Sequence, residues 1–202
     1  MHCKPRWKLA AIATLAPVFL VANSDPSALE YTLDSEASSV SAKVPFFGLA
    51  SKTARFPKME GNVTIVPGEP EAARIAVTFD APALEAPDSV TLSRLRGEKF
   101  FWVEKYPEVR FVGERLELPS ANKGVVEGEL TARGVTQPAT LKVEFETPPL
   151  EAPKGQPISF TGKTTIDRRE YGMKSYQVIV GNKVKITLNA LMLPNATLAS
   201  RR

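Results

Sequence analysis

The chain of 202 residues contains one histidine and one cysteine, His2 and Cys3, and both lie at its amino-terminal end. A mature protein without that end has neither an imidazole nor a thiol. Serine triads, thiol nucleophiles, disulfides and the usual histidine or cysteine zinc sites are then excluded for lack of side chains. There is also no C-x-x-C-H haem sequence and no acidic calcium loop. We therefore expect no catalytic residues, no metal and no cofactor.

The first residues follow the pattern of a secretory signal peptide. Three basic residues between positions 4 and 8 precede an apolar run from Leu9 to Val21. That run is shorter than the ~20 residues that a membrane-spanning helix needs. We expect residues 1–24 to be a signal peptide, with cleavage after Ser24 or Ala28, and the mature protein to be periplasmic or secreted. An uncleaved membrane anchor is the alternative.

Little net charge remains once the signal peptide is removed. The whole chain has 26 basic and 22 acidic side chains, and three of the basic ones lie in residues 1–24. The mature chain then has 23 basic against 22 acidic side chains, a net charge of about +1. No basic run interleaved with aromatic residues remains, so we expect no nucleic-acid partner.

Alternation of apolar and polar residues dominates the rest of the chain, which is long enough for one domain of roughly 175 residues with an ordinary core. A period of two is typical of half-buried β-strands. We expect the domain to span residues 29–193, followed by a flexible tail over 194–202. Eight segments are predicted as strands: 40–46, 63–66, 75–79, 109–118, 125–131, 141–145, 158–166 and 186–190.

Short turn sequences separate these segments, at 67–70, 122–124, 134–138 and 181–182. Short connections join antiparallel neighbours, whereas parallel strands need long crossovers. The pattern therefore predicts an antiparallel meander. A closed barrel and a two-sheet sandwich are both compatible with it. Gly128, Gly134 and Pro138 are interpreted as turn residues and not as ligand contacts, because glycine permits positive φ angles and proline presets a bend.

Residues 88–107 break the alternation. Asp88 or Ser89 is suited to cap a short helix near residues 88–97, and four aromatic residues follow that helix within seven positions. The segment is either a plug that closes one end of the sheet or a lid over a ligand cavity. The lid candidates are Leu92, Leu95 and Trp102.

Five blocks of residues occur in an order found in a known family. They are Tyr31–Asp34 with Ser38–Val40; Phe47–Leu49 with Arg55, Phe56 and Gly61; Phe100–Pro107 with Phe111; Gly128–Pro138; and Ile166–Met173 with Val180, Gly181 and Val184. Through these blocks the chain resembles the YceI-like family of exported, lipocalin-like proteins that bind polyisoprenoid lipids. The resemblance implies an all-β fold, an extended antiparallel barrel of eight strands with a short helical segment.

Two positions depart from the family pattern. Phe47 stands where relatives often have a histidine, and Trp102 stands where an acidic residue is common. Both changes predict a more apolar site and argue against any histidine-dependent chemistry of relatives in this chain.

The resemblance also implies a ligand, a polyprenyl compound or an isoprenoid quinone tail held inside the barrel of a carrier or reservoir. Burial of such a chain contributes ~25 cal/mol per Å² and needs no catalytic group. Arg133, Arg168 and Arg169 are suited either to a phosphate head group or to surface ion pairs. The expected ligand-binding side chains, each equally suited to an ordinary core, are Val44, Phe46, Phe79, Leu92, Leu95, Phe100, Phe101, Trp102, Phe111, Phe145, Phe160 and Ile166.

Two other classes of function are compatible with the sequence. The first is a stress-related interaction module, whose core is filled by its own side chains and whose outer surface binds a partner. The second is a hydrolase that uses carboxylates such as Asp34, Asp80, Asp167 and Glu170, whose separations the sequence does not fix. A membrane-spanning mature protein is not expected, and a homodimer is compatible with each of these functions.

Overall fold

The computed structural model describes residues 28–48, 50–149 and 155–195. Within these ranges one α-helix, α1 (Ser89–Arg96), lies between the fifth and sixth strands, and a short 3-10 turn, η1 (Arg168–Tyr171), follows the ninth. The predicted signal peptide and residues 196–202 of the predicted tail lie outside the described residues. The strands are β1 (Leu29–Leu33), β2 (Ser39–Phe46), β3 (Ala50–Phe56), β4 (Met59–Val66), β5 (Glu69–Asp80), β6 (Glu108–Ser120), β7 (Lys123–Ala132), β8 (Val135–Phe145), β9 (Ile158–Asp167) and β10 (Lys183–Pro194).

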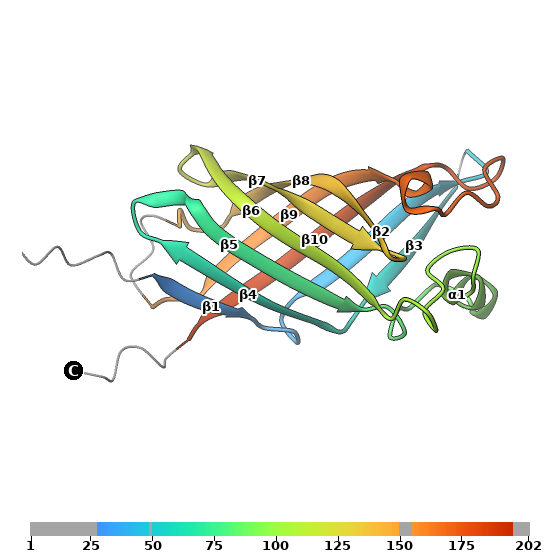
Figure 1. The fold of residues 1–202 in the computed structure, drawn as a ribbon, viewed down its shortest axis with the longest axis horizontal. Helices are drawn as coiled ribbons and strands as arrows, with labels where there is room; N and C mark the ends of the chain where they lie inside the picture. Colours follow the sequence, from blue (N-terminus) through green and yellow to red (C-terminus); the bar gives the residue numbers. More distant parts are fainter. Residues whose placement is uncertain (1–27, 49, 150–154, 196–202) are drawn as a thin grey trace, which may run out of the picture.

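The strands close into an antiparallel barrel with eight positions in its wall (Figure 1). β1 and β2 both pair with β10, and β4 and β3 pair with β1 and β2 respectively. β1 and β2 together therefore form one long strand of the wall with a break in the middle, and β3 and β4 together form the next one. β5 to β10 follow in chain order, and the β1–β10 ladder closes the ring. This confirms the predicted eight-stranded barrel and excludes the sandwich.

Two of the ten strands, β1 and β3, were missing from the sequence prediction. β3 is mostly polar, and only Ala54 and Phe56 on it are buried. Pro57 separates β3 from β4 in the chain. Asp34 makes the corresponding break between β1 and β2, because its carboxylate accepts hydrogen bonds from the backbone N–H groups of Glu36 and Ala37, each at 3.0 Å.

Two features predicted as turns lie inside strands instead. The turn between β7 and β8 is limited to Arg133 and Gly134, and Pro138 belongs to β8, opposite Glu129. Gly128 lies within β7, where a Cβ atom would be 2.0 Å from the carbonyl oxygen of Val112 on β6. Gly128 therefore permits a close approach of two strands. Gly134, with a φ of +71°, does serve a turn as predicted.

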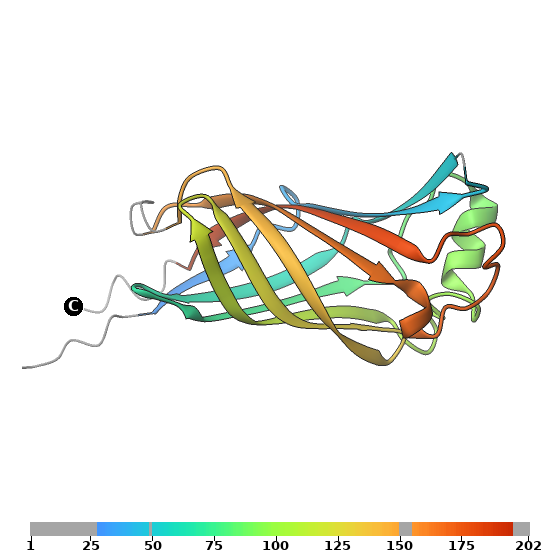
Figure 2. The same ribbon diagram turned by 90° about the horizontal axis from the view of Figure 1, so that it is seen from above.

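Helix α1 lies across one end of the barrel, beside the loop that joins η1 to β10 (Figure 2). We call this end the mouth. Asp88 caps the helix and Gly97 follows it, which confirms the predicted helix near residues 88–97. In the described part of the chain, no helix is long and apolar enough to cross a membrane.

Candidate functional site

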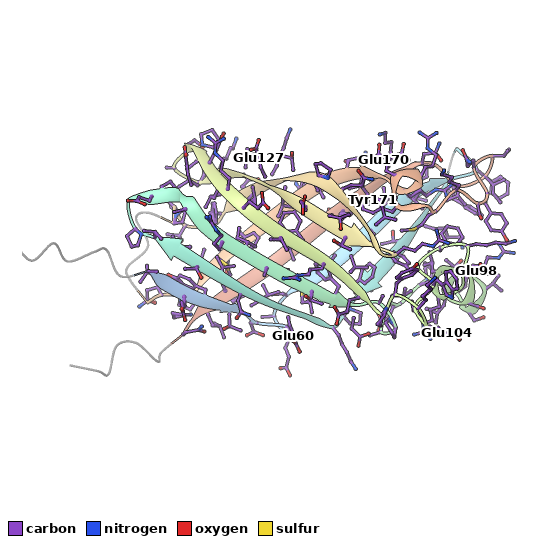
Figure 3. The ribbon with its side chains drawn as sticks, in the orientation of Figure 1. Glu60, Glu98, Glu104, Glu127, Glu170 and Tyr171 are labelled. Atoms are coloured by element: carbon purple, nitrogen blue, oxygen red, sulfur yellow. The ribbon has the colours of Figure 1, made fainter. Side chains whose placement is uncertain are left out.

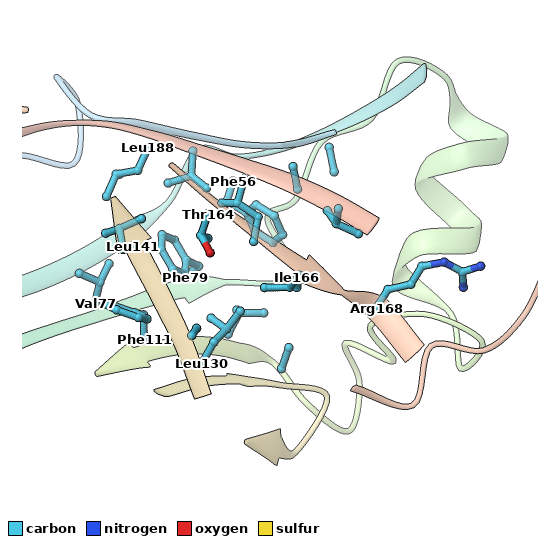
Figure 4. A pocket seen from close by; sticks show the side chains of 18 of the residues that line it. Phe56, Val77, Phe79, Phe111, Leu130, Leu141, Thr164, Ile166, Arg168 and Leu188 are labelled. Atoms are coloured by element: carbon cyan, nitrogen blue, oxygen red, sulfur yellow. The ribbon is translucent and has the colours of Figure 1, made fainter. Parts of the chain in front are cut away.

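The barrel encloses a cavity of about 370 Å³ that is lined almost entirely by apolar side chains (Figure 4). Inward positions alternate along β5 and β10, so these two strands contribute Phe79 and Leu188 to the lining. Phe111, Leu141 and Ile186 point inward but are only half-buried. Their uncovered surface borders an empty space, because close-packed neighbours would bury it. The interior is therefore hollow, as a ligand-binding barrel requires.

Ten of the twelve expected ligand-binding side chains line this cavity. They include the aromatic pair Phe145 and Phe160, whose ring centroids lie 5.9 Å apart at the end of the cavity away from the mouth. The others are Val44, Phe46, Phe79, Leu95, Phe100, Phe101, Phe111 and Ile166. The structure brings them together, and their role in binding stays a prediction.

The remaining two, both lid candidates, do not line the cavity. Leu92 packs against the hydrophobic core without bordering the cavity. Trp102 packs edge-to-face on Tyr106, with ring centroids 5.8 Å apart. The segment 88–107 combines the two alternatives, since Phe100 is buried like a plug while Leu95 and the exposed Val90 border the cavity.

Polar groups of the cavity lining concentrate at the mouth. Lys52 of β3 and Asp88 before α1 form an ion pair at 2.7 Å, and both border the opening together with Thr91 and Arg94. Asp88 also accepts hydrogen bonds from the backbone N–H of Thr91 at 2.8 Å and from its hydroxyl at 2.9 Å. The hydrogen bond from Lys52, followed by those from Thr91, holds the pKa of Asp88 well below its usual range. This arrangement fastens the helix to the rim of the barrel.

A family model described as "YceI-like domain" matches residues 31–192. The chain belongs to the YceI-like family. A relative named as a UPF0312 protein, from Pseudomonas putida strain GB-1, is 28% identical over 157 residues, which cover 77% of this chain and 82% of the relative. The resemblance drawn from the five sequence blocks is thereby confirmed.

Solved structures share the fold of this YceI-like chain. BcnA of Burkholderia cenocepacia superposes with a TM-score of 0.70 at 23% identity, over 79% of this chain and 98% of BcnA. A polyisoprenoid binding domain from Saccharophagus degradans, implicated in plant cell wall breakdown, gives a TM-score of 0.64 at 14% identity, over 83% of this chain and 99% of that domain. The barrel is therefore a recurrent architecture and not peculiar to this sequence.

The two departures from the YceI-like pattern do not act where the sequence predicted. Phe47 and Trp102 were expected to make the site more apolar, but neither lines the cavity. Phe47 occupies the turn between β2 and β3 and is 63% exposed. Both residues have positive φ angles, 53° and 49°, which are uncommon for bulky side chains. Neither residue therefore changes the polarity of the cavity wall.

Arg168 borders the cavity near the mouth, and its guanidinium points away from the apolar lining (Figure 4). The side chain is buried, and four of its five N–H groups donate to the backbone carbonyls of Met173, Ser175, Val180 and Gly181. The fifth is directed at the side-chain oxygen of Asn182, at 3.5 Å. Burial lowers the pKa of this guanidinium, although arginine stays charged in proteins. Arg168 therefore organises the loop between η1 and β10 and has no donor left for a head group.

The other two arginines considered for a head group are also engaged. Arg169 forms two hydrogen bonds to the Asp167 carboxylate, at 3.0 and 2.6 Å, and these hold the pKa of Asp167 well below its usual range. Arg133 donates to the carbonyl oxygens of Gly172 and Glu98, at 2.8 and 2.9 Å. Only Arg169 makes the exposed ion pair that the sequence alternative predicted. Arg168 and Arg133 instead bond backbone carbonyl oxygens.

The wall of the barrel is incomplete between β8 and β9. Their ladder has four paired positions, from Lys142–Lys163 to Phe145–Phe160, whereas β9 and β10 are paired at ten. Pro138 is paired with β7 but lies in the part of β8 that has no partner on the β9 side, where a missing N–H costs no ladder bond. An outer groove follows this gap, and it shares Ala139, Thr140, Thr164, Ile166 and Ile186 with the inner cavity. Only a thin layer of side chains separates the two spaces here.

The carboxylates considered for hydrolysis serve mainly as local caps. Asp34 and Asp80 accept backbone hydrogen bonds within their own turns. Asp167 and Glu170 border the outer groove beside Tyr171, and burial raises the pKa of that tyrosine to about 12. Across the described residues, no three His, Cys, Asp or Glu side chains gather in a way suited to a metal ion.

Several cavity residues were missing from the sequence prediction. Most of them are inward positions on predicted strands, where alternation was the signal that could have found them. Leu33 and Phe56 are the exceptions, because they lie on β1 and β3, which were not predicted. Smaller or aliphatic side chains were passed over in favour of aromatic ones. The main omissions are Leu33, Phe56, Val77, Leu130, Leu141, Thr164, Ile186 and Leu188.

Proposed function

We propose that the chain is a carrier or reservoir for a long isoprenoid lipid, either a polyprenyl compound or the tail of a quinone, held inside the barrel. One observation supports this above all: a cavity of about 370 Å³ with an apolar lining and with its polar groups concentrated at the mouth. That volume is within the range of about 300–1,000 Å³ typical of small-molecule sites. A hydrocarbon chain fits the interior and a polar end fits the rim.

Two further facts support the proposal. One structural neighbour is described as a polyisoprenoid binding domain, and its fold superposes over 83% of this chain. The amino-terminal segment has the pattern of a signal peptide, so we place the carrier in the periplasm or outside the cell. The proposal involves binding alone and requires no catalytic group.

The stress-related interaction module is less favoured, because it requires a core filled by the protein's own side chains. Residues such as Phe111 and Leu141 leave part of their surface open to the cavity. An interaction module gives no physical reason for this open apolar surface, whose exposure to water costs roughly 25 cal/mol per Å².

The test uses neighbouring residues of β8 that point to opposite sides of the wall. Leu141 faces the cavity and Lys142 is exposed on the outer face. Leu141→Trp is expected to obstruct the cavity and reduce uptake of an isoprenoid quinone at least about tenfold, because the larger ring occupies space that the ligand would otherwise contact. Lys142→Trp is the matched control and is expected to bind like the wild type. Native mass spectrometry of each purified protein measures occupancy.

A second variant keeps the test decisive if Leu141→Trp does not fold. Ala42→Phe also projects into the cavity, from β2 on the opposite side, and adds bulk to a half-buried inward position. Circular dichroism melts identify which variants remain folded. If folded Leu141→Trp and Ala42→Phe both retain full occupancy, or if the wild type never contains a hydrophobic molecule, the carrier proposal is wrong.

A further inference from the structure

Exposed apolar side chains gather at the mouth. Five large apolar side chains are exposed among the described residues, and four of them lie at this end: Phe47 (63% exposed), Val90 (58%), Tyr176 (37%) and Val178 (99%). They come from three segments that are far apart in the sequence, the β2–β3 turn, the first turn of α1 and the loop before β10. We call these four residues the mouth patch. Exposure of so much apolar surface in one place is typical of an interaction site.

Specific contacts hold the three segments together. The backbone N–H of Phe47 donates to the carbonyl oxygen of Ile179 at 2.8 Å, which joins the β2–β3 turn to the loop. The ring of Tyr176 stacks on Phe100 with centroids 6.0 Å apart, which joins the loop to the segment after α1. The ion pair between Lys52 and Asp88 joins β3 to the helix. The mouth patch is therefore a fixed surface.

Backbone strain supports a functional role for the patch. Phe47 and Tyr176 both adopt left-handed conformations, with φ angles of 53° and 57°. Bulky residues rarely adopt this region, and each such residue costs on the order of 1 kcal/mol or more. The strained backbone presents these two aromatic side chains to solvent, although burial would have been the more stable arrangement for them.

The mouth patch is continuous with the cavity. Val90 and Tyr176 belong both to the exposed patch and to the cavity lining. A molecule that covered the patch would therefore also cover the opening. An apolar medium at this surface would meet the cavity without intervening water.

The charged residues around the mouth patch are mostly basic, which favours a partner with a negatively charged surface. Arg94 and Lys99 flank Tyr176, each 5.5 Å from its ring centroid. Three segments at the mouth, residues 46–52, 88–100 and 172–182, carry five cations and two carboxylates, a net charge of +3. The cations are Lys52, Arg94, Arg96, Lys99 and Lys174, and the carboxylates are Asp88 and Glu98. At the opposite end of the barrel, Arg115 is shared by Glu71, Glu117 and Glu127. The mouth is thus the basic end of the molecule.

We propose that the mouth docks on an anionic lipid surface, with the mouth patch inserted among the head groups and its cations against lipid phosphates. Apolar side chains surrounded by Lys and Arg are the combination that binds the interface of anionic membranes. The docked cavity opens onto the hydrocarbon, so an isoprenoid chain passes between bilayer and barrel without crossing water. This last step rests on the proposed function, whereas docking itself does not.

The test is co-sedimentation of the purified protein with vesicles of phosphatidylcholine, alone or with about one third phosphatidylglycerol. We expect binding to the mixed vesicles, weakened between ~0.1 M and ~1 M salt, where the screening length falls from about 10 Å to about 3 Å. Phe47→Ser/Val178→Ser is expected to bind at least about tenfold more weakly, because two side chains no longer enter the interface. Leu193→Ser removes the exposed apolar side chain at the other end and is the matched control.

A charge variant tests whether the basic residues at the mouth contribute to binding of anionic vesicles. Lys99→Glu/Lys174→Glu is expected to lose binding to the mixed vesicles, and Lys123→Glu, in the β6–β7 hairpin at the far end, is expected to keep it. Equal binding by the wild type and the patch variant, or binding that ignores phosphatidylglycerol, overturns the proposal. So does a wild type that binds no vesicles and sediments as a dimer which the patch variant disrupts.

Uptake of an isoprenoid quinone from detergent solution tests ligand binding without a membrane, and so distinguishes the carrier proposal from the docking proposal. Patch variants that load from detergent but not from vesicles support both proposals. Vesicle docking by a wild type that never loads supports docking and contradicts the carrier. Loading from vesicles that is unchanged in both the patch variant and the charge variant contradicts docking and leaves the carrier intact.

Discussion

Single residues decide whether the barrel wall can close. Gly128 of β7 faces Gly113 of β6, and a Cβ at Gly128 would meet the backbone of β6. A Cβ at Gly113 would instead meet the side chains of Val126 and Ile75, at 2.6 and 3.1 Å. The register of β6 and β7 also shifts between Gly113 and Arg115. Glycine here adjusts the curvature of the wall, since irregular ladders bend and twist a sheet.

Gly128→Ala is expected to lower the free energy of unfolding by about 2 kcal/mol or more. The added Cβ would lie 2.0 Å from the Val112 carbonyl oxygen and 2.8 Å from the Gly113 Cα, so the backbone of β6 would have to move. Urea denaturation measures the change. Gly97→Ala, whose Cβ finds ordinary contacts of 3.4 and 3.5 Å, is the control and stays close to the wild type. A Gly128→Ala protein of unchanged stability would contradict the close approach.

At the scale of elements, the junction of β9 and η1 depends on one buried carboxylate. Asp167 caps η1 through the backbone N–H of Arg169 at 3.0 Å, pairs with the Arg169 side chain and lies 3.6 Å from Lys183 of β10. Directly after it, Arg168 holds the loop that carries half of the mouth patch. Two consecutive residues of opposite charge thus position different parts of the same end.

Acid is expected to loosen this junction. The hydrogen bonds and charge of Arg169 lower the pKa of Asp167 in the folded protein. The carboxylate therefore stabilises the fold fully above the ordinary carboxyl range, and this contribution is lost as the pH falls below about 4. We expect Asp167→Asn to melt at a lower temperature than the wild type at pH 7 and to lose less on further acidification. Thermal melts from neutral pH to about pH 3 measure both effects.

The control for this experiment is Glu60→Gln. Glu60 projects from the outer face of β4 and is exposed, far from η1 (Figure 3). It is expected to leave the pH profile of thermal stability unchanged. A wild-type profile in Asp167→Asn would show that the buried carboxylate does not link folding to pH.

At the scale of the whole molecule, the cavity links stability to occupancy. An empty barrel exposes apolar surface that a bound chain would cover, and a ligand that binds only the folded state stabilises it by mass action. Delipidated protein is therefore expected to melt at a lower temperature than loaded protein. At a free ligand concentration of about 100 Kd the gain is ~2.7 kcal/mol.

Titration of delipidated protein with an isoprenoid quinone in detergent, followed by thermal melts, measures this linkage. The melting temperature is expected to rise continuously with ligand concentration in the wild type. In Leu141→Trp, whose cavity is obstructed, it is expected to rise less at the same ligand concentration. A wild-type melting temperature independent of ligand would contradict binding inside the barrel.

The sequence alone determined the local structure. Alternation predicts strands such as 75–79 and 141–145 because neighbouring side chains of a strand face opposite sides, and that rule needs no tertiary information. Asp88 predicts the helix start because a carboxylate satisfies backbone N–H groups only a few residues away. Ten inward side chains of the candidate site followed from the same rules, combined with the family resemblance.

The tertiary structure decided what depends on contacts between distant segments. Strand β3 is too polar to be read as a strand and is held by its ladder with β2. Gly128 and Pro138 resemble turn residues in the sequence. Only the neighbouring strands show that Gly128 permits the close approach of β6 and that Pro138 lies where β8 has no partner on the β9 side. The mouth patch combines residues more than 100 positions apart. Local rules cannot place such residues side by side, because chain closure and packing fix their distances.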